Sequence, residues 1–187
     1  MLNIAVYCGA SVGEKDEYAK SAQKLGQWIV DSGHNLVYGG GKVGLMGIVS
    51  DTVLDARGEV YGVMPQFLVD REIAHDKLTD LIITQDMHER KKKMMQLANV
   101  YIALPGGPGT LEEISEVISW GRVGEHQNPC IFFNAGGYYH LVQLFYDKMV
   151  EDGFLSLEDR ANILFSDNFA EIETFISNYK AASIRQY

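Results

Sequence analysis

At 187 residues with 47% hydrophobic side chains, the chain is long enough to bury a real core, and we expect residues 1–187 to form one domain. The net charge of −9 argues against an extended nucleic-acid surface, which would recruit Lys and Arg in bulk, and two cysteines are too few for a disulfide framework. The sequence shows neither a basic signal-peptide region nor an apolar run of roughly 18 residues that could span a bilayer, so we expect a cytoplasmic protein that contacts no membrane.

Short apolar strands alternate with helical patterns along the chain. The predicted strands are 4–8, 36–38, 60–64, 81–84, 100–104, 130–133 and 163–165. The predicted helices are roughly 18–32, 47–57, 88–98, 111–122, 139–152 and 170–179. Strands that are apolar at every position indicate a sheet covered on both faces, and the alternation indicates parallel strands with right-handed crossovers. The pattern favours an α/β fold with an open, doubly wound, Rossmann-like parallel sheet of about seven strands, and residues 182–187 are expected to form a loose tail.

Four glycine-rich or polar segments follow predicted strands. They are residues 8–11, residues 39–44, the segment leading to 87–91, and the loop that begins at 105. In an open parallel sheet, ligands bind beyond the carboxyl ends of the strands. We therefore expect these segments to converge on one site.

The loop from Pro105 to Gly109 is the most informative of the four, because its three glycines stand where a strand ends and a helix begins. Glycine lets a ligand approach the backbone closely, and a helix N-terminus offers unpaired N–H groups and a partial positive charge. The sequence therefore predicts an anion site, with phosphate as its anion. Glu113 is expected in the first turn of the helix. Thr110 and Glu113 also fit a simple capping pair, T-x-x-E, which is compatible with the anion site.

The segment Gly39–Gly44 spells G-x-G-x-x-G, but it follows the second predicted strand, and the next strand ends in Met64-Pro65 without an acidic residue. A dinucleotide site is therefore disfavoured, and a P-loop is excluded because Val43 follows Lys42 where Ser or Thr is required. Two interpretations stay open. The loop binds phosphate or ribose through its amides, or it forms a tight turn that packs a helix against a strand.

Four cations, Arg90 to Lys93, open a predicted helix, where the helix dipole disfavours positive charge. The cost predicts an anionic partner, either a ligand phosphate or a carboxylate such as that of Glu113. The histidines are scattered and neither H-E-x-x-H nor C-x-x-C occurs, so the sequence predicts no metal site.

Together these segments resemble the "lonely guy" (LOG) family, which also carries a lysine-decarboxylase-like label. The resemblance rests on C-G-A-S at 8–11, V-Y-G-G-G at 37–41, G-L-M-G at 44–47, G-V-M-P at 62–65, M-H-E-R-K at 87–91 and P-G-G-P-G-T-L-E-E at 105–113. It covers the chain to about residue 153. The paired M-H-x-R-K and P-G-G-x-G-T-x-x-E motifs make it specific, because both must occur at this spacing.

The resemblance implies a homodimeric phosphoribohydrolase that releases the free base and ribose 5-phosphate from cytokinin riboside 5′-monophosphates, with AMP as a common alternative substrate. It implies that Arg90 and Glu113 are catalytic. From the chemistry of the reaction we expect neither a metal nor a cofactor. The substrate-binding residues, from the resemblance and the glycine loops together, are Gly39, Gly40, Gly41, Gly44, Glu72, Met87, Lys91, Gly106, Gly107, Pro108, Gly109, Thr110, Leu111, Glu112 and Ser119. Ser119 departs from the family, because many members have Thr at this position.

Breaking an N-glycosidic bond builds positive charge on the ribose ring. We expect Glu113 to stabilise that charge, to contact the ribose hydroxyls or to activate water. Arg90 stays charged, so we expect it to fix the nucleotide and Glu113 or to stabilise the leaving base. Two alternatives stay open: a general AMP nucleosidase with no cytokinin role, and a non-catalytic carrier of a nucleotide or cofactor.

The apolar side chains of the helix from Leu111, namely Ile114, Val117, Ile118 and Trp120, fit either the core or a partner subunit. In a dimer formed across this helix, Arg122 or nearby groups would complete the pocket of the neighbour.

Overall fold

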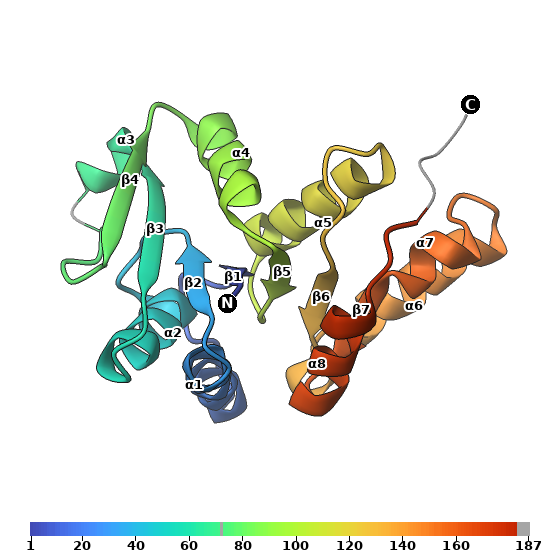
Figure 1. Ribbon diagram of the computed structural model, residues 1–187, viewed down its shortest axis with the longest axis horizontal. Helices are drawn as coiled ribbons and strands as arrows, with labels where there is room; N and C mark the ends of the chain where they lie inside the picture. Colours follow the sequence, from blue (N-terminus) through green and yellow to red (C-terminus); the bar gives the residue numbers. More distant parts are fainter. Residues whose placement is uncertain (72, 183–187) are drawn as a thin grey trace.

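The computed structural model describes residues 1–71 and 73–182, and its strands form one parallel sheet (Figure 1). The sheet order is β4-β3-β2-β1-β5-β6-β7, so the first strand lies at the centre. The strands are β1 (Asn3–Tyr7), β2 (Asn35–Tyr38), β3 (Val60–Pro65), β4 (Asp80–Thr84), β5 (Val100–Ala103), β6 (Cys130–Phe133) and β7 (Ile163–Ser166). The expected α/β fold with a doubly wound, Rossmann-like sheet is confirmed.

Helices cover both faces of this sheet. They are α1 (Asp16–Asp31), α2 (Gly44–Asp55), α3 (Gln66–Val69), α4 (Met87–Leu97), α5 (Pro108–Arg122), the 3₁₀ turn η1 (Ala135–Gly137), α6 (His140–Glu151), α7 (Leu157–Ala161) and α8 (Phe169–Asn178). The short elements α3, η1 and α7 were not expected from the sequence, because they are too short to show a periodic apolar pattern. Of the expected tail 182–187, all but Ala182 lies outside the described residues.

Two apolar layers hold the helices to the sheet. On one face α1, α2 and α8 pack through side chains such as Leu25, Val49 and Ile172; on the other, α4 and α5 pack through Met94 and Ile114. In Figure 1 these two groups of helices lie below and above the sheet. The residues of β1, β2, β5 and β6 are almost all buried, which confirms the two-sided cover expected from their apolar runs.

The strand order reverses between the neighbouring strands β1 and β5, which makes this position the topological switch point of the sheet. The connections that follow these two strands go to opposite faces of the sheet. The loop after β1 runs to α1 on one face and the loop after β5 runs to α5 on the other. The two loops touch, since the Gly9 amide donates to the Pro105 carbonyl at 3.1 Å. Such a switch point opens a crevice at the carboxyl edge of the sheet, where ligands bind in folds of this kind. No helix in the described ranges is long and apolar enough to cross a bilayer.

Candidate functional site

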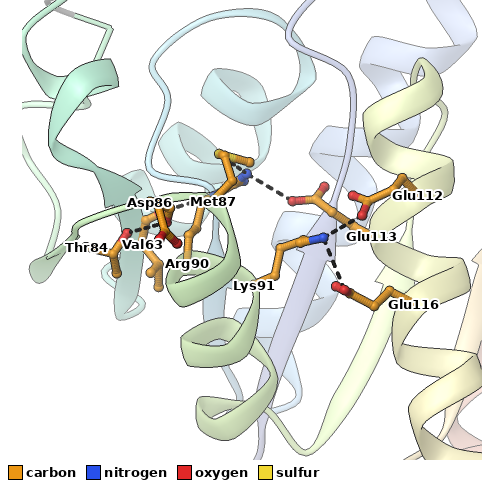
Figure 2. A network of polar contacts seen from close by, with 9 residues as sticks. All are labelled: Val63, Thr84, Asp86, Met87, Arg90, Lys91, Glu112, Glu113 and Glu116. Carbon is orange, nitrogen blue, oxygen red and sulfur yellow. Dashed lines mark hydrogen bonds and ion pairs between the residues drawn. The ribbon is translucent and has the colours of Figure 1, made fainter.

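Arg90 on α4 and Glu113 on α5 form an ion pair above the carboxyl edge of the sheet (Figure 2). Arg90 Nη1 lies 3.1 Å from Glu113 Oε1, and both side chains are about nine-tenths buried. Arg90 Nε also donates to the Val63 carbonyl at 3.1 Å, which ties the guanidinium to the end of β3. Because two nitrogens of the guanidinium, Nε and Nη1, are both held, it presents a fixed positive charge to Glu113.

The start of α4 explains how a cation run can open a helix. Asp86 is the N-cap, and its carboxylate accepts from the amides of His88 and Glu89, both at 2.8 Å. A capping carboxylate stabilises the helix N-terminus, offsetting the cost of nearby cations. Arg90 finds its partner in Glu113, so the expectation that a carboxylate would face this run is confirmed.

Lys91 makes the second link between α4 and α5. Its Nζ contacts Glu116 Oε1 at 3.1 Å and also contacts Glu112, as Figure 2 shows. Burial lowers the pKa of Lys91, but hydrogen bonds to Glu112 and Glu116 outweigh burial and leave the pKa raised. Lys91 is therefore a stable cation that neutralises two of the three carboxylates on this stretch of α5.

Glu113 has spare capacity to bind a ligand. Burial raises the pKa of its carboxyl above the usual range, and the charge of Arg90 opposes that rise. Oε1 is buried yet accepts no hydrogen bond of good geometry from the described residues, although Arg90 Nη1 is close. A buried carboxylate oxygen without a donor is costly, so the site is suited to a hydroxyl or water that donates to it.

The loop after β5 leads into α5, which begins at Pro108 with Gly107 as its N-cap. The amides of Gly107, Gly109 and Thr110 donate to no described residue, and a Cβ at Gly107 or Gly109 would meet nothing within 4 Å. The helix N-terminus is therefore open and its donors are free, as an anion site requires. Phosphate binding here stays a prediction.

The helix start corrects two expectations. The sequence pattern placed the start at Leu111, because Pro108, Gly109 and Thr110 carry no apolar periodicity, but proline is well suited to the first helical position. Glu113 consequently lies in the second turn, not in the first. Thr110 is the third helical residue and not a cap, so the capping pair T-x-x-E is wrong.

The Gly39–Gly44 loop has clear structural roles. The Lys42 amide donates to the Ile73 carbonyl at 3.0 Å, and the Leu45 amide donates to the Gly9 carbonyl at 3.1 Å. Gly44 has a positive φ of 65°, and a Cβ there would lie 2.2 Å from the carbonyl carbon of Ala10. These contacts support the tight-turn interpretation, whereas contact of Gly39, Gly40 or Gly41 with a ligand stays a prediction.

The remaining predicted residues are spread over three places. Met87 begins α4 and its Sδ lies 3.8 Å from Arg90 Nη1, within the site. Leu111 and Ser119 instead line a separate groove of about 460 Å³ between α5 and α6, whose lining includes neither Arg90 nor Glu113. Glu72 lies outside the described residues.

Arg122 also lines the α5–α6 groove, but its Nε is paired with Asp159 Oδ2 at 3.1 Å. Of the apolar residues expected to face either core or partner, Ile114, Val117 and Ile118 are buried within the chain, so core packing is confirmed for them. Across the described ranges, no three His, Cys, Asp or Glu side chains are placed to hold a metal ion.

Sequence reasoning missed two kinds of supporting residue. The Asp86 cap could have been found from an acidic residue placed just before the helix and three positions before Glu89. The hydroxyl groups of Tyr138 and Tyr139 reach the loop after β5, and only the G-G-Y-Y pattern after β6 hinted at a special turn there.

Known proteins resemble this chain in sequence and in fold. Residues 46–175 match a family model described as "Possible lysine decarboxylase". The cytokinin riboside 5′-monophosphate phosphoribohydrolase LOG5 of Arabidopsis thaliana is 42% identical over 177 residues, covering 95% of this chain and 78% of the relative. The corresponding LOG enzyme of Oryza sativa subsp. japonica is 40% identical over 186 residues, covering 97% and 76%.

Two solved structures share the fold at lower identity. The molybdenum cofactor binding protein of Rippkaea orientalis is 21% identical with a TM-score of 0.69, covering 94% of this chain and 95% of that chain. The molybdenum cofactor carrier protein of Chlamydomonas reinhardtii is 18% identical with a TM-score of 0.67, covering 95% and 99%. At these identities the likeness shows the fold alone.

Proposed function

Since the chain belongs to the LOG family, we propose that it is an N-glycosyl hydrolase that converts cytokinin riboside 5′-monophosphates, and also AMP, to the free base and ribose 5-phosphate. One observation carries the proposal. A buried carboxylate with an unsatisfied oxygen, Glu113, lies on the same helix as an open N-terminus with free amides. The five helical steps from Pro108 to Glu113 advance roughly 8 Å along the helix axis, a separation that a ribose 5-phosphate can bridge.

The reaction breaks the bond between C1′ of the ribose and a ring nitrogen of the base. The electron pair of that bond leaves with the base, which takes up a proton from solvent, and a water molecule adds its oxygen to C1′ and loses a proton. The ribose ring becomes cationic in the transition state. The Glu113 carboxylate stabilises that cation and accepts the proton that water loses, for which the raised pKa of the buried carboxyl suits it.

Arg90 acts by charge and position. Its guanidinium stays protonated, so it orients Glu113 through the 3.1 Å ion pair and stabilises negative charge that develops on the departing base. The charge of Arg90 also opposes the rise in the pKa of Glu113 and so favours the ionised carboxylate.

The 5′-phosphate binds at the N-terminus of α5, where the amides of Gly107, Gly109 and Thr110 have no partner within residues 1–71 and 73–182. This contact uses a part of the substrate that does not react to hold C1′ beside Glu113. A nucleoside without the phosphate should therefore be a poor substrate.

The test is release of free base from AMP and from isopentenyladenosine monophosphate by the wild type and by Arg90→Ala. For the wild type, the ratio of kcat/KM for isopentenyladenosine monophosphate to kcat/KM for AMP separates a cytokinin-directed enzyme from a general AMP nucleosidase. Binding of both nucleotides without release of any base would instead support the carrier alternative and overturn the proposal.

We further propose that the protein is a homodimer that pairs through the α5–α6 groove. Leu141 and Phe145 on α6 are 77% and 61% exposed beside Leu111, an unusual apolar load for a surface helix. Ser119 lies in this groove, away from the Arg90–Glu113 pair of its own chain. Pairing through the groove would bring Ser119 close to the partner subunit, where it could contact the substrate bound by that subunit. Light scattering measures the oligomeric state directly.

We place the protein in the cytoplasm. Cys8 and Cys130 are both free and buried, as expected for a chain that makes no use of disulfides. Cell fractionation tests this location.

A further inference from the structure

Three successive carbonyl groups in the loop after β5 are each held by a hydrogen bond from another segment. The Leu104 carbonyl accepts from the Tyr139 hydroxyl at 2.6 Å, and the Gly106 carbonyl accepts from the Tyr138 hydroxyl at 2.6 Å. Between them, the Pro105 carbonyl accepts from the Gly9 amide at 3.1 Å. The peptide units that lead into α5 are thus fixed one after another, which a connecting loop alone does not require.

The two tyrosines lie in a tight turn after β6, from which their hydroxyl groups reach the loop after β5. Gly136 and Gly137 in η1 have positive φ values of 56° and 73°, which turn the chain sharply after β6. The Asn134 side chain then accepts from the Tyr139 amide at 2.7 Å and closes the turn. Local backbone chemistry therefore sets where both phenol groups stand.

Ring packing fixes the orientation of Tyr138. Its ring makes edge contacts with Tyr18 at 5.4 Å and with Tyr139 at 4.9 Å between centroids. Tyr139 is buried and packs in turn against Phe132 at 4.9 Å. Tyr138 is 41% exposed, so its ring is held by neighbouring rings but is not part of the core. Its hydroxyl donates to the loop after β5.

A carbonyl that is held in one direction fixes the next amide in the opposite direction, because the peptide unit is planar and trans. Tyr138 holds the Gly106 carbonyl and thereby sets the direction of the Gly107 N–H. Gly107 is the N-cap of α5, and its amide has no partner among the described residues. We propose that Tyr138 is a positioning residue that aims the free Gly107 amide at the 5′-phosphate of the substrate. Tyr139 supports it by packing against its ring and by anchoring the loop at Leu104, whose peptide partner Pro105 has no N–H.

This inference rests on the proposed function, and its test separates the two. Tyr138→Phe keeps the ring and removes only the donor. It should weaken binding of ribose 5-phosphate and raise KM for AMP by about tenfold, with little change in kcat, because one orienting hydrogen bond is lost. The kcat/KM for adenosine, which has no phosphate, should not change.

Tyr101→Phe is the matched control. The Tyr101 hydroxyl donates to the Met95 carbonyl at 3.0 Å, the same kind of bond at the far end of α4. This variant should keep the wild-type affinity for ribose 5-phosphate and the wild-type ratio of AMP to adenosine turnover. Tyr139→Phe should have the smaller effect on ribose 5-phosphate affinity, because the Leu104 carbonyl that it holds is joined to Pro105, which has no N–H. Circular dichroism confirms the fold of this variant, since Tyr139 is buried.

Titration calorimetry with ribose 5-phosphate decides the inference independently of turnover. If Tyr138→Phe binds ribose 5-phosphate as tightly as Tyr101→Phe does, Tyr138 does not position the loop. If the wild type releases no base from any nucleotide but Tyr138→Phe still loses affinity for ribose 5-phosphate, the proposed hydrolysis fails and the positioning role stands.

Discussion

Gly39 lies directly against the guanidinium of Arg90, so that a Cβ at position 39 would stand 2.4 Å from Arg90 Nη2. The end of β2 therefore shapes the space in which the ion pair with Glu113 forms. A glycine that the sequence suggested as a phosphate or ribose contact thus leaves room, in the structure, for the side chain of Arg90, the arginine proposed to be catalytic.

Gly39→Ala should displace the Arg90 guanidinium and lower kcat by roughly tenfold or more, because a misplaced group loses its share of transition-state stabilisation. A double-mutant cycle with Arg90→Ala tests whether this loss of kcat arises through the position of Arg90. Adding Gly39→Ala to Arg90→Ala should cost little further activity. An additive loss would show that Gly39 acts by another route, such as contact with the substrate.

Glu113→Gln should lower kcat by about 10² or more, since in the proposed mechanism Glu113 stabilises the oxocarbenium ion by its charge and takes the proton of water. Glu116→Gln is the matched control, because Glu116 lies on the same helix and contacts Lys91 at 3.1 Å. Steady-state turnover of AMP compares the two variants. Near-normal activity in Glu113→Gln would remove this carboxylate from the mechanism.

The pH dependence of kcat/KM should show an acid limb above the ordinary glutamate pKa of about 4.3, because burial raises the pKa of Glu113. In the proposed mechanism the ionised carboxylate is the active form, so activity should fall as pH falls through that raised pKa. In Arg90→Ala the opposing positive charge is gone, and the limb of the residual activity should move to higher pH. An unmoved limb would assign the titration to another group.

Lys91→Met should move the same limb upward, because Lys91 lowers the pKa of Glu113 whereas Glu112 and Glu116 raise it. Without Lys91, the carboxylates of Glu112 and Glu116 both lose their partner. Adding Glu116→Gln to Lys91→Met removes one of these two negative charges. The double variant should therefore recover part of the shift in a pH–rate profile. If it recovers none, the charges on α5 do not couple to Glu113.

Phe145→Asp should convert the proposed dimer to a monomer, because a charge in an apolar interface is left desolvated and unpaired. Phe145 is 61% exposed in the single chain, so the change should leave the free energy of unfolding of the subunit within about 0.5 kcal/mol. Light scattering reports the mass. A mass equal to that of the wild type would place the interface elsewhere.

The sequence alone determined the local features of this protein, because they depend on neighbouring residues. The apolar runs located the strands to within about two residues, and glycines after strands marked the loops that meet at the carboxyl edge of the sheet. The M-H-x-R-K and P-G-G-x-G-T-x-x-E motifs singled out Arg90 and Glu113. Helix starts were less certain, as at Pro108, since capping residues carry no apolar periodicity.

Only the tertiary structure decided which of these features touch. The placement of β1 beside β5 brings Gly9 against the Pro105 loop, and the packing of α4 beside α5 brings Arg90 within 3.1 Å of Glu113. Gly39, Tyr138 and Tyr139 acquire their roles from these contacts, which join residues far apart in the chain. Strand order and helix packing are set by burial summed over the whole domain, and no local pattern of residues encodes that sum.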